Sequence, residues 1–271
     1  MPVAWYEAQG AFNRGPGMIH RIRDNVAKHN WFAVAVDLGI VVLGVFLGIQ
    51  ASNWNQDLAD RAEARELRTE IIRNLKANEA DLDARAAYFG QVRAHAVTAL
   101  ESLASPKGLG EQFLVDAYQA SQSWLRPLER TAYEELVSTG LARKIGGAQT
   151  RTMLSSYYVG TQGFDRTALA VTPYRDRLRR VMDLRIQEKI RASCDDVMQS
   201  LPGGGQAPAL PSSCQPNLDP IAVSRVARKI GALDELDQDL TRLIIDIDQK
   251  QALFERTRQN AVRLRRRLEA A

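Results

Sequence analysis

One carboxylate and several small residues interrupt an apolar stretch, and their types and spacing could support assembly inside a membrane. The stretch WFAVAVDLGIVVLGVFLGIQASNWN covers residues 31–55. Asp37, Gly44 and Gly48 are separated by seven and four residues, so a helix places them on one face. Glycines four residues apart let two helix backbones approach closely in lipid, and a carboxylate on that face would point into the contact. The pattern predicts a lipid-buried assembly surface.

Two other interpretations of Asp37 remain open. Glycine is frequent in membrane-spanning helices, and Asp37 would lie about 9 Å inside Trp31, near the lipid headgroups. Alternatively, single-span stators of ion-driven motors carry one aspartate in the span, so Asp37 could take part in ion transfer. The sequence contains no peptidoglycan-binding pattern, which makes the ion-coupled, stator-like subunit the more remote alternative.

Length and composition predict that this segment spans a membrane. Phe32 to Ile49 is a run of 18 residues with one charge. Trp31 and Trp54 bracket the run as interface anchors, 23 residues apart, or about 35 Å on a helix. A cleavable signal peptide would have a shorter apolar core and a small-x-small cleavage site. We therefore expect a signal anchor with its transmembrane helix at 31–53.

Basic residues beside the segment predict its orientation. Residues 11–30 contain four Lys and Arg, whereas residues 51–65 contain two. Positive charge collects on the cytoplasmic side, so residues 1–30 would form a short cytoplasmic amino terminus. In a Gram-negative bacterium, residues 54–271 would then be the periplasmic domain of a single-pass inner-membrane protein.

The two cysteines agree with an oxidising compartment. Cys194 and Cys214 flank a Pro/Gly-rich loop predicted at 201–219. A disulfide closing this loop would stabilise the fold by about 3 kcal/mol in the chain-entropy model. Two unpaired thiols are the alternative. Because no CxxC spacing is present, a redox enzyme is not indicated.

Apolar residues at helical spacing continue beyond the span. Residues 49–89 contain neither Gly nor Pro, and a stripe with steps of three, four or seven begins at Leu67. Asn78 interrupts this stripe. We expect the spanning helix to continue without a break to about Ser105.

Further helices follow from the same periodicity, with Gly140 at a helix C′ position and no strand-like alternation between turn signals. The chain is therefore expected to be all-α. The helices expected at 149–158 and 172–200 could alternatively form one helix kinked at Pro173. The expected ranges are 111–124, 131–139, 149–158, 172–200 and 220–271.

The predicted helices at 54–105 and 220–271 have the same length, 52 residues, or about 78 Å each. Antiparallel, coiled-coil-like packing would give an elongated extracytoplasmic helical bundle with the shorter helices at its sides. Its carboxyl end would return to the bilayer, where four arginines would meet anionic headgroups. The alternative is a solvated terminus. The four residues are Arg263, Arg265, Arg266 and Arg267.

Three sequence blocks, VDLGIVVLGVFLGIQASNWN, TAYEELVSTGLARKI and LSSYY, together resemble an uncharacterised bacterial family of single-span membrane proteins. Its members have an acidic residue early in the span, often Glu rather than Asp, and a Gln-x-x-Asn-Trp-Asn exit. The resemblance implies a helical extracytoplasmic domain and no known activity. The matching positions are Asp37, Gly44, Gln50, Asn53, Trp54 and Asn55, then Tyr133 to Gly140, then Tyr157 and Tyr158.

Motifs for catalysis or metal binding are missing from the sequence. His95 is expected to lie alone on a helix, PGGGQAP lacks the Gly-Lys-Ser/Thr of a phosphate loop, and residues 234–239 lack the glycine of a calcium loop. The net charge of +4 is small and evenly mixed, which does not favour nucleic acid. We expect no enzymatic activity, no catalytic residue, no cofactor and no metal.

These observations favour a membrane-anchored scaffold or adaptor that self-associates, or binds another membrane protein, through its span. A cytoplasmic part of about 30 residues is too short for an output domain. The alternative is a periplasmic sensor of an unidentified small molecule, which would signal through another membrane protein. Aromatic residues could then line a pocket, although core packing is the plainer interpretation. They are Trp124, Tyr133, Tyr157, Tyr158 and Tyr174.

Overall fold

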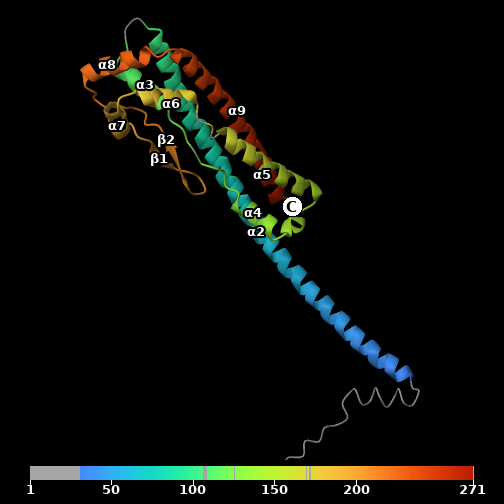
Figure 1. Ribbon diagram of the computed structural model, residues 1–271. Coiled ribbons are helices and arrows are strands. Elements are labelled where there is room, and N and C mark those ends of the chain that lie inside the picture. Colours follow the sequence, from blue (N-terminus) through green and yellow to red (C-terminus); the bar gives the residue numbers. More distant parts are fainter. Residues whose placement is uncertain (1–30, 106–108, 125, 169, 171, 271) are drawn as a thin grey trace, which may run out of the picture. The chain divides into compact units, whose positions relative to one another are not determined.

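The chain is mostly helical, as the sequence predicts (Figure 1). Two compact units divide it, Met1–Asp60 and Arg61–Ala271, here called unit 1 and unit 2. The predicted cytoplasmic terminus at 1–30 lies outside the described residues. The computed structural model describes residues 31–105, 109–124, 126–168, 170 and 172–270.

Helix α2 (Trp31–Leu103) joins the predicted span to the first bundle helix without a break. Residues 49–89 lack Gly and Pro, so nothing in that stretch weakens the hydrogen-bond ladder of the helix. Gly90 continues the helix, and a Cβ at this position would meet the side chain of Gln251 at 3.6 Å. The prediction of one continuous helix ending near Ser105 is confirmed.

Shorter helices fill unit 2 between α2 and the carboxyl-terminal helices. Gly140 follows α4 with φ of 74°, the left-handed conformation expected at a helix C′ position. The helix predicted at 149–158 extends further, to Ala168. The helices are α3 (Glu111–Ala120), α4 (Thr131–Ser138), the 3-10 helix η1 (Leu141–Lys144), α5 (Ala148–Ala168), α6 (Pro173–Val181) and α7 (Leu184–Ser193).

The helix predicted at 172–200 is wrong as a single element, because it divides into α6 and α7 at Met182. The division is stabilised by Gln187, whose side-chain nitrogen donates to the carbonyl oxygens of Arg179 and Met182 at 2.8 and 2.7 Å. Those bonds satisfy acceptors that the end of α6 leaves without a helical partner.

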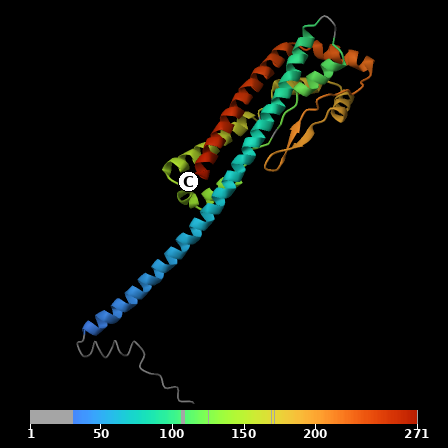
Figure 2. The same cartoon turned by 180° about the vertical axis from the view of Figure 1, so that it is seen from behind.

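Helix α9 (Leu236–Glu269) lies antiparallel along the part of α2 that belongs to unit 2 (Figure 2). Near one end of the pair, Arg93 contacts Asp248 at 2.6 Å. Near the other, the Arg68 side chain donates to the carbonyl oxygen of Leu268. The predicted antiparallel pairing of long helices is therefore present within unit 2.

The prediction of one helix over 220–271 is wrong. Helix α8 (Pro220–Gly231) ends before α9 begins, and Glu235 between them has a left-handed φ of 61°. Helix α8 contacts α3 and α6, and its buried face includes Val226 and Ile230. Helix α9 contacts α5 and α6, so the two helices share α6 but differ in their other neighbour, α3 for α8 and α5 for α9.

A β-hairpin corrects the strictly all-α prediction. Strand β1 (Val197–Ser200) pairs antiparallel with β2 (Gln206–Ala209). The turn between them contains three glycines with positive φ, at 86°, 99° and 89°. The glycine run predicted as part of an irregular loop at 201–219 therefore closes a hairpin turn, since glycine adopts positive φ without steric cost.

Two hydrophobic cores form within unit 2, at successive levels of α2. The first core contains α2 residues together with residues from α4, η1, α5 and the end of α9. The second core combines later residues of α2 with α3, α6, α7, α8, the hairpin and the first half of α9. From α2, the first core takes Ala64, Leu67, Ile71 and Leu75, and the second takes Leu82, Tyr88, Phe89, Val92, Ala96 and Ala99.

Candidate functional site

The predicted assembly face lies in the part of α2 that belongs to unit 1. By length and composition, α2 is long and apolar enough to cross a membrane, and the qualifying window has no buried residue. A Cβ placed on Gly44 or Gly48 would meet no described atom within 4 Å. Trp54 is 70% exposed. An apolar helix without a packed face needs lipid or another helix around it, because water solvates such a surface poorly.

Three polar residues are buried on α2 where the two cores meet, and their role was not foreseen from the sequence. Asn78, Asp81 and Arg85 are spaced by three and four residues, so they share the face that carries the apolar stripe. We call them the polar layer. A buried charge costs several kcal/mol unless it is paired and hydrogen-bonded, so each member must find partners.

Arg85 has the largest fully buried side chain of the layer, at 0% exposure. Its guanidinium donates to the Asp81 carboxylate at 2.6 Å and to the carbonyl oxygen of Arg126 at 2.5 Å. It also lies 5.1 Å from the ring centroid of Trp124, within cation–π range. Arg126 pairs with the other oxygen, Oδ1, of the same Asp81 carboxylate. The buried positive charge of Arg85 is thus compensated by the Asp81 carboxylate inside the bundle.

Asn78 holds the extended segment that precedes α4. Its amide nitrogen donates to the Glu129 carbonyl oxygen at 2.9 Å, and its amide oxygen accepts from the Glu129 N–H at 2.8 Å. The same amide nitrogen lies 3.2 Å from the hydroxyl of Tyr157 on α5. Burial raises the pKa of Tyr157, which keeps this phenol neutral. One side chain therefore joins three segments.

A salt bridge extends the layer to α5. The Arg130 guanidinium contacts the carboxylate of Asp165, a residue of α5 that is 8% exposed, at 2.6 Å. The layer and its partners therefore join α2, the segment at 126–130 and α5. Oδ1 of Asp165 has no hydrogen-bond partner among the described residues, but each charge of the network is paired. Paired networks of this kind favour one packing arrangement over alternatives, so we assign the layer a structural role.

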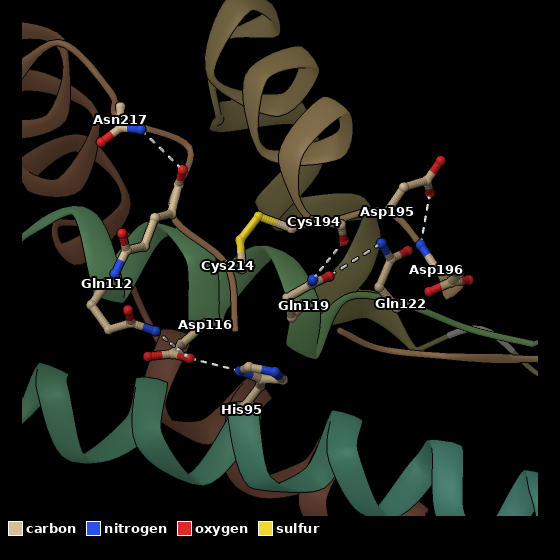
Figure 3. Close-up of a disulfide and its surroundings, with 11 residues drawn as sticks. His95, Gln112, Asp116, Gln119, Gln122, Cys194, Asp195, Asp196, Cys214 and Asn217 are labelled. Atoms are coloured by element: carbon tan, nitrogen blue, oxygen red, sulfur yellow. Dashed lines mark hydrogen bonds and ion pairs between the residues drawn. A yellow bond between two sulfur atoms is a disulfide. The ribbon is translucent and has the colours of Figure 1, made fainter. Parts of the chain in front are cut away.

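The predicted disulfide between Cys194 and Cys214 is present in unit 2, with Cα atoms 5.2 Å apart (Figure 3). It fastens the end of α7 to the segment leading to α8. The Gln119 side chain on α3 donates to the carbonyl oxygen of Cys194 at 2.9 Å. The bridge thereby belongs to the second core, where Cys194 is buried.

The sequence suggested that His95 lies alone on a helix, but the structure gives it a partner on another helix, α3. Its Nδ1 lies 2.7 Å from Oδ1 of Asp116, which also accepts from the Gln112 side chain at 3.1 Å (Figure 3). Asp116 is 2% exposed, and its Oδ2 has no hydrogen-bond partner among the described residues. A buried carboxylate of this kind orients an imidazole. Within the described residues, no group of three His, Cys, Asp or Glu is placed to hold a metal ion.

The terminal arginines differ in their surroundings. Arg265 contacts Glu79 at 2.7 Å and Glu269 at 3.0 Å, so it belongs to the pairing of α9 with α2. Arg267 reaches the Gln149 side-chain oxygen at 3.2 Å. Arg263 and Arg266 are exposed. Contact of the four residues with lipid headgroups stays a prediction.

The five aromatic residues singled out in the sequence contribute to packing. Tyr133 stacks on Tyr158 with centroids 4.2 Å apart, and buried Tyr174 donates to the Ala117 carbonyl oxygen at 2.9 Å. Tyr157 also lines a surface pocket of about 240 Å³ between α5 and α9. This pocket places Tyr157, one of the predicted aromatic group, beside a surface cavity.

No protein family, curated protein or solved structure is significantly similar to this chain. The resemblance to single-span membrane proteins therefore stays a prediction that rests on the quoted residues.

The polar layer left one signal in the sequence. Asn78, Asp81 and Arg85 occupy positions at which helical spacing would place apolar residues. Polar residues inside an apolar stripe indicate a buried network, yet their partners at Arg126 and Glu129 could not be named without the structure.

Proposed function

We propose that the chain is a membrane-anchored scaffold or adaptor, with an inward amino terminus and a periplasmic bundle. It assembles through the span, by self-association or with another membrane protein. One observation carries the proposal. The apolar part of α2 buries none of its residues, and Gly44 and Gly48 leave open space on the face that carries Asp37. Small residues on such a face permit close helix contact in lipid.

The bundle supports a presenting role. Unit 2 has two cores, a satisfied polar layer and a disulfide, so it can keep a fixed surface without a ligand.

A small-molecule sensor is the second candidate. The pocket of about 240 Å³ beside Tyr157 favours it, since Ser156, Asn260 and Arg263 offer polar groups there. A ligand that raises the melting temperature of the full chain, and loses that effect in Asn260→Ala, would favour the sensor.

The assembly face can be tested in the full chain by crosslinking in lipid. Gly44→Ile together with Gly48→Ile should reduce the crosslinked oligomer about tenfold, because bulky side chains separate the two backbones. Gly39→Ile is the matched control. Gly39 is also open, but helical geometry places it nearly opposite Gly44 and Gly48.

Unchanged crosslinking in the double variant, or equal loss in the control, would contradict assembly through this face.

Topology is checked separately. A reporter active only in the periplasm should work when fused after the last residue, and should be inactive when fused near Arg14.

A further inference from the structure

A basic surface covers the part of unit 2 that contains the first core. We call it the basic end surface. All its members are exposed, and they come from η1 and from the last turns of α9. They are Arg143, Lys144, Arg263, Arg266 and Arg267. We propose that this surface binds anionic lipid headgroups. The proposal rests on the proposed function in one respect, because it requires that the first part of α2 lies in a bilayer.

Packing of the first core brings the two groups of basic residues together. Buried Leu141 fixes η1, and buried Leu264 and Leu268 fix the end of α9 in the same core. The Arg267 guanidinium lies 3.2 Å from the side-chain oxygen of Gln149, only five residues after Lys144. Residues more than 110 positions apart in sequence therefore share one surface.

Charge is concentrated in the segments that build this end of unit 2. Residues 61–70, 131–151 and 261–269 contain ten Lys and Arg against six Asp and Glu. That excess of four equals the net charge of the whole chain, +4. Arg265 is left out of the surface, because its side chain is only partly exposed, whereas the five members are exposed. Because the five basic residues of the surface lie together, they attract anions more strongly than the same number of charges spread over the chain would.

The chain between the predicted interface anchor and the first core is short. Trp54 is the predicted interface anchor, and Ala64 is already buried in the first core, ten residues later. A linker of that length spans at most about 35 Å when fully extended and about 15 Å as a helix. The surface therefore experiences a high local concentration of headgroups.

The composition of the surface favours headgroups over a protein partner. None of the exposed large apolar residues described in the chain falls within 141–145 or 260–270. Protein interfaces are anchored by buried aromatic or aliphatic residues, whereas headgroup attraction requires charge alone. Each basic residue near an anionic surface strengthens binding about fivefold.

The test uses the full chain, one copy per lipid nanodisc, with a fluorophore on Gly147→Cys and an acceptor dye on lipid headgroups. Gly147 is exposed, near η1, and a Cβ there meets nothing within 4 Å. Energy transfer should be at least twofold higher in discs with about a third phosphatidylglycerol than in phosphatidylcholine discs. The difference should vanish at 1 M salt, where the Debye length is about 3 Å.

Changing the five residues of the basic end surface to Gln should abolish the difference between the two lipids. The matched control changes five exposed basic residues of α6, α7 and α8 to Gln, and should keep the difference. Equal transfer in both lipids, or equal loss in the control, would overturn the proposal. Each disc holds one copy, so self-association through the span cannot affect this result. Span assembly is tested separately by the Gly44 and Gly48 variants. The control residues are Arg180, Arg185, Lys189, Arg191 and Arg228.

Discussion

Two parts of α2 share one backbone conformation and differ in what surrounds them. In unit 1, Leu43 is 59% exposed and Leu47 is 63% exposed. In unit 2, Leu67 is 3% exposed, and Ile71 and Leu75 are fully buried. In the first part, the apolar window of α2 has no buried residue among those described, whereas the second part concentrates its apolar residues on one stripe that α4, α5 and α9 cover. Helical structure follows from local sequence, but burial depends on what packs against the helix.

The largest effect is expected at the polar layer. Arg85→Ala removes a fully buried side chain and leaves Asp81 with one cationic partner. The free energy of unfolding in detergent should therefore fall by about 4 kcal/mol. Arg73→Ala is the control, since that side chain is 68% exposed and should change stability by less than about 0.5 kcal/mol. A similar small change in both variants would contradict a structural polar layer. Denaturant titration followed by circular dichroism measures the difference.

Leucines on the two parts of α2 provide a matched pair. Leu75→Ala should destabilise unit 2 by about 3 kcal/mol, because it leaves a cavity in the first core. Leu43→Ala should leave the same unfolding transition within about 0.5 kcal/mol of the parent, since no described residue packs over Leu43. The two variants should be compared in the same detergent by thermal unfolding. A loss at Leu43 as large as that at Leu75 would show that unit 1 contributes to the stability of the bundle.

The disulfide separates a covalent contribution from these packing effects. Cys194→Ser with Cys214→Ser should lower the free energy of unfolding by about 3 kcal/mol, as expected for a closed loop of about 20 residues. Alkylation of the denatured, non-reduced parent should label neither cysteine. Reduction should destabilise the parent and leave the double variant unaffected. If reduction leaves the parent as stable as before, the bridge is not formed in solution.

Features that depend on residues near each other in sequence were predicted correctly, and features that depend on distant packing partners were missed. The continuous helix through residues 49–89, the left-handed Gly140 and the pairing of Cys194 with Cys214 were all predicted correctly. Each rests on neighbours in sequence or on the only two cysteines present. The division between α8 and α9 was missed, because their apolar stripes have the same period, while the packing of α8 on α3 and of α9 on α5 leaves no local signal.

The hairpin and the environment of His95 were missed for a similar reason. β1 is held by β2 and the glycine turn rather than by an alternating pattern, and all four of its residues are exposed. His95 has Asp116 as its partner, 21 residues away on another helix. Neither contact has a periodic signature in the sequence.

The sequence by itself determined where α2 is helical, which part of it could lie in lipid, and which two cysteines could be joined. These properties depend on residue type and on spacing within a few turns of helix. Only the tertiary structure decided why Asn78 and Arg85 can stand inside an apolar stripe. Their partners are the backbones of Glu129 and Arg126, 51 and 41 residues away. A buried polar group is stable only beside such partners, and chain folding, not local spacing, brings them together.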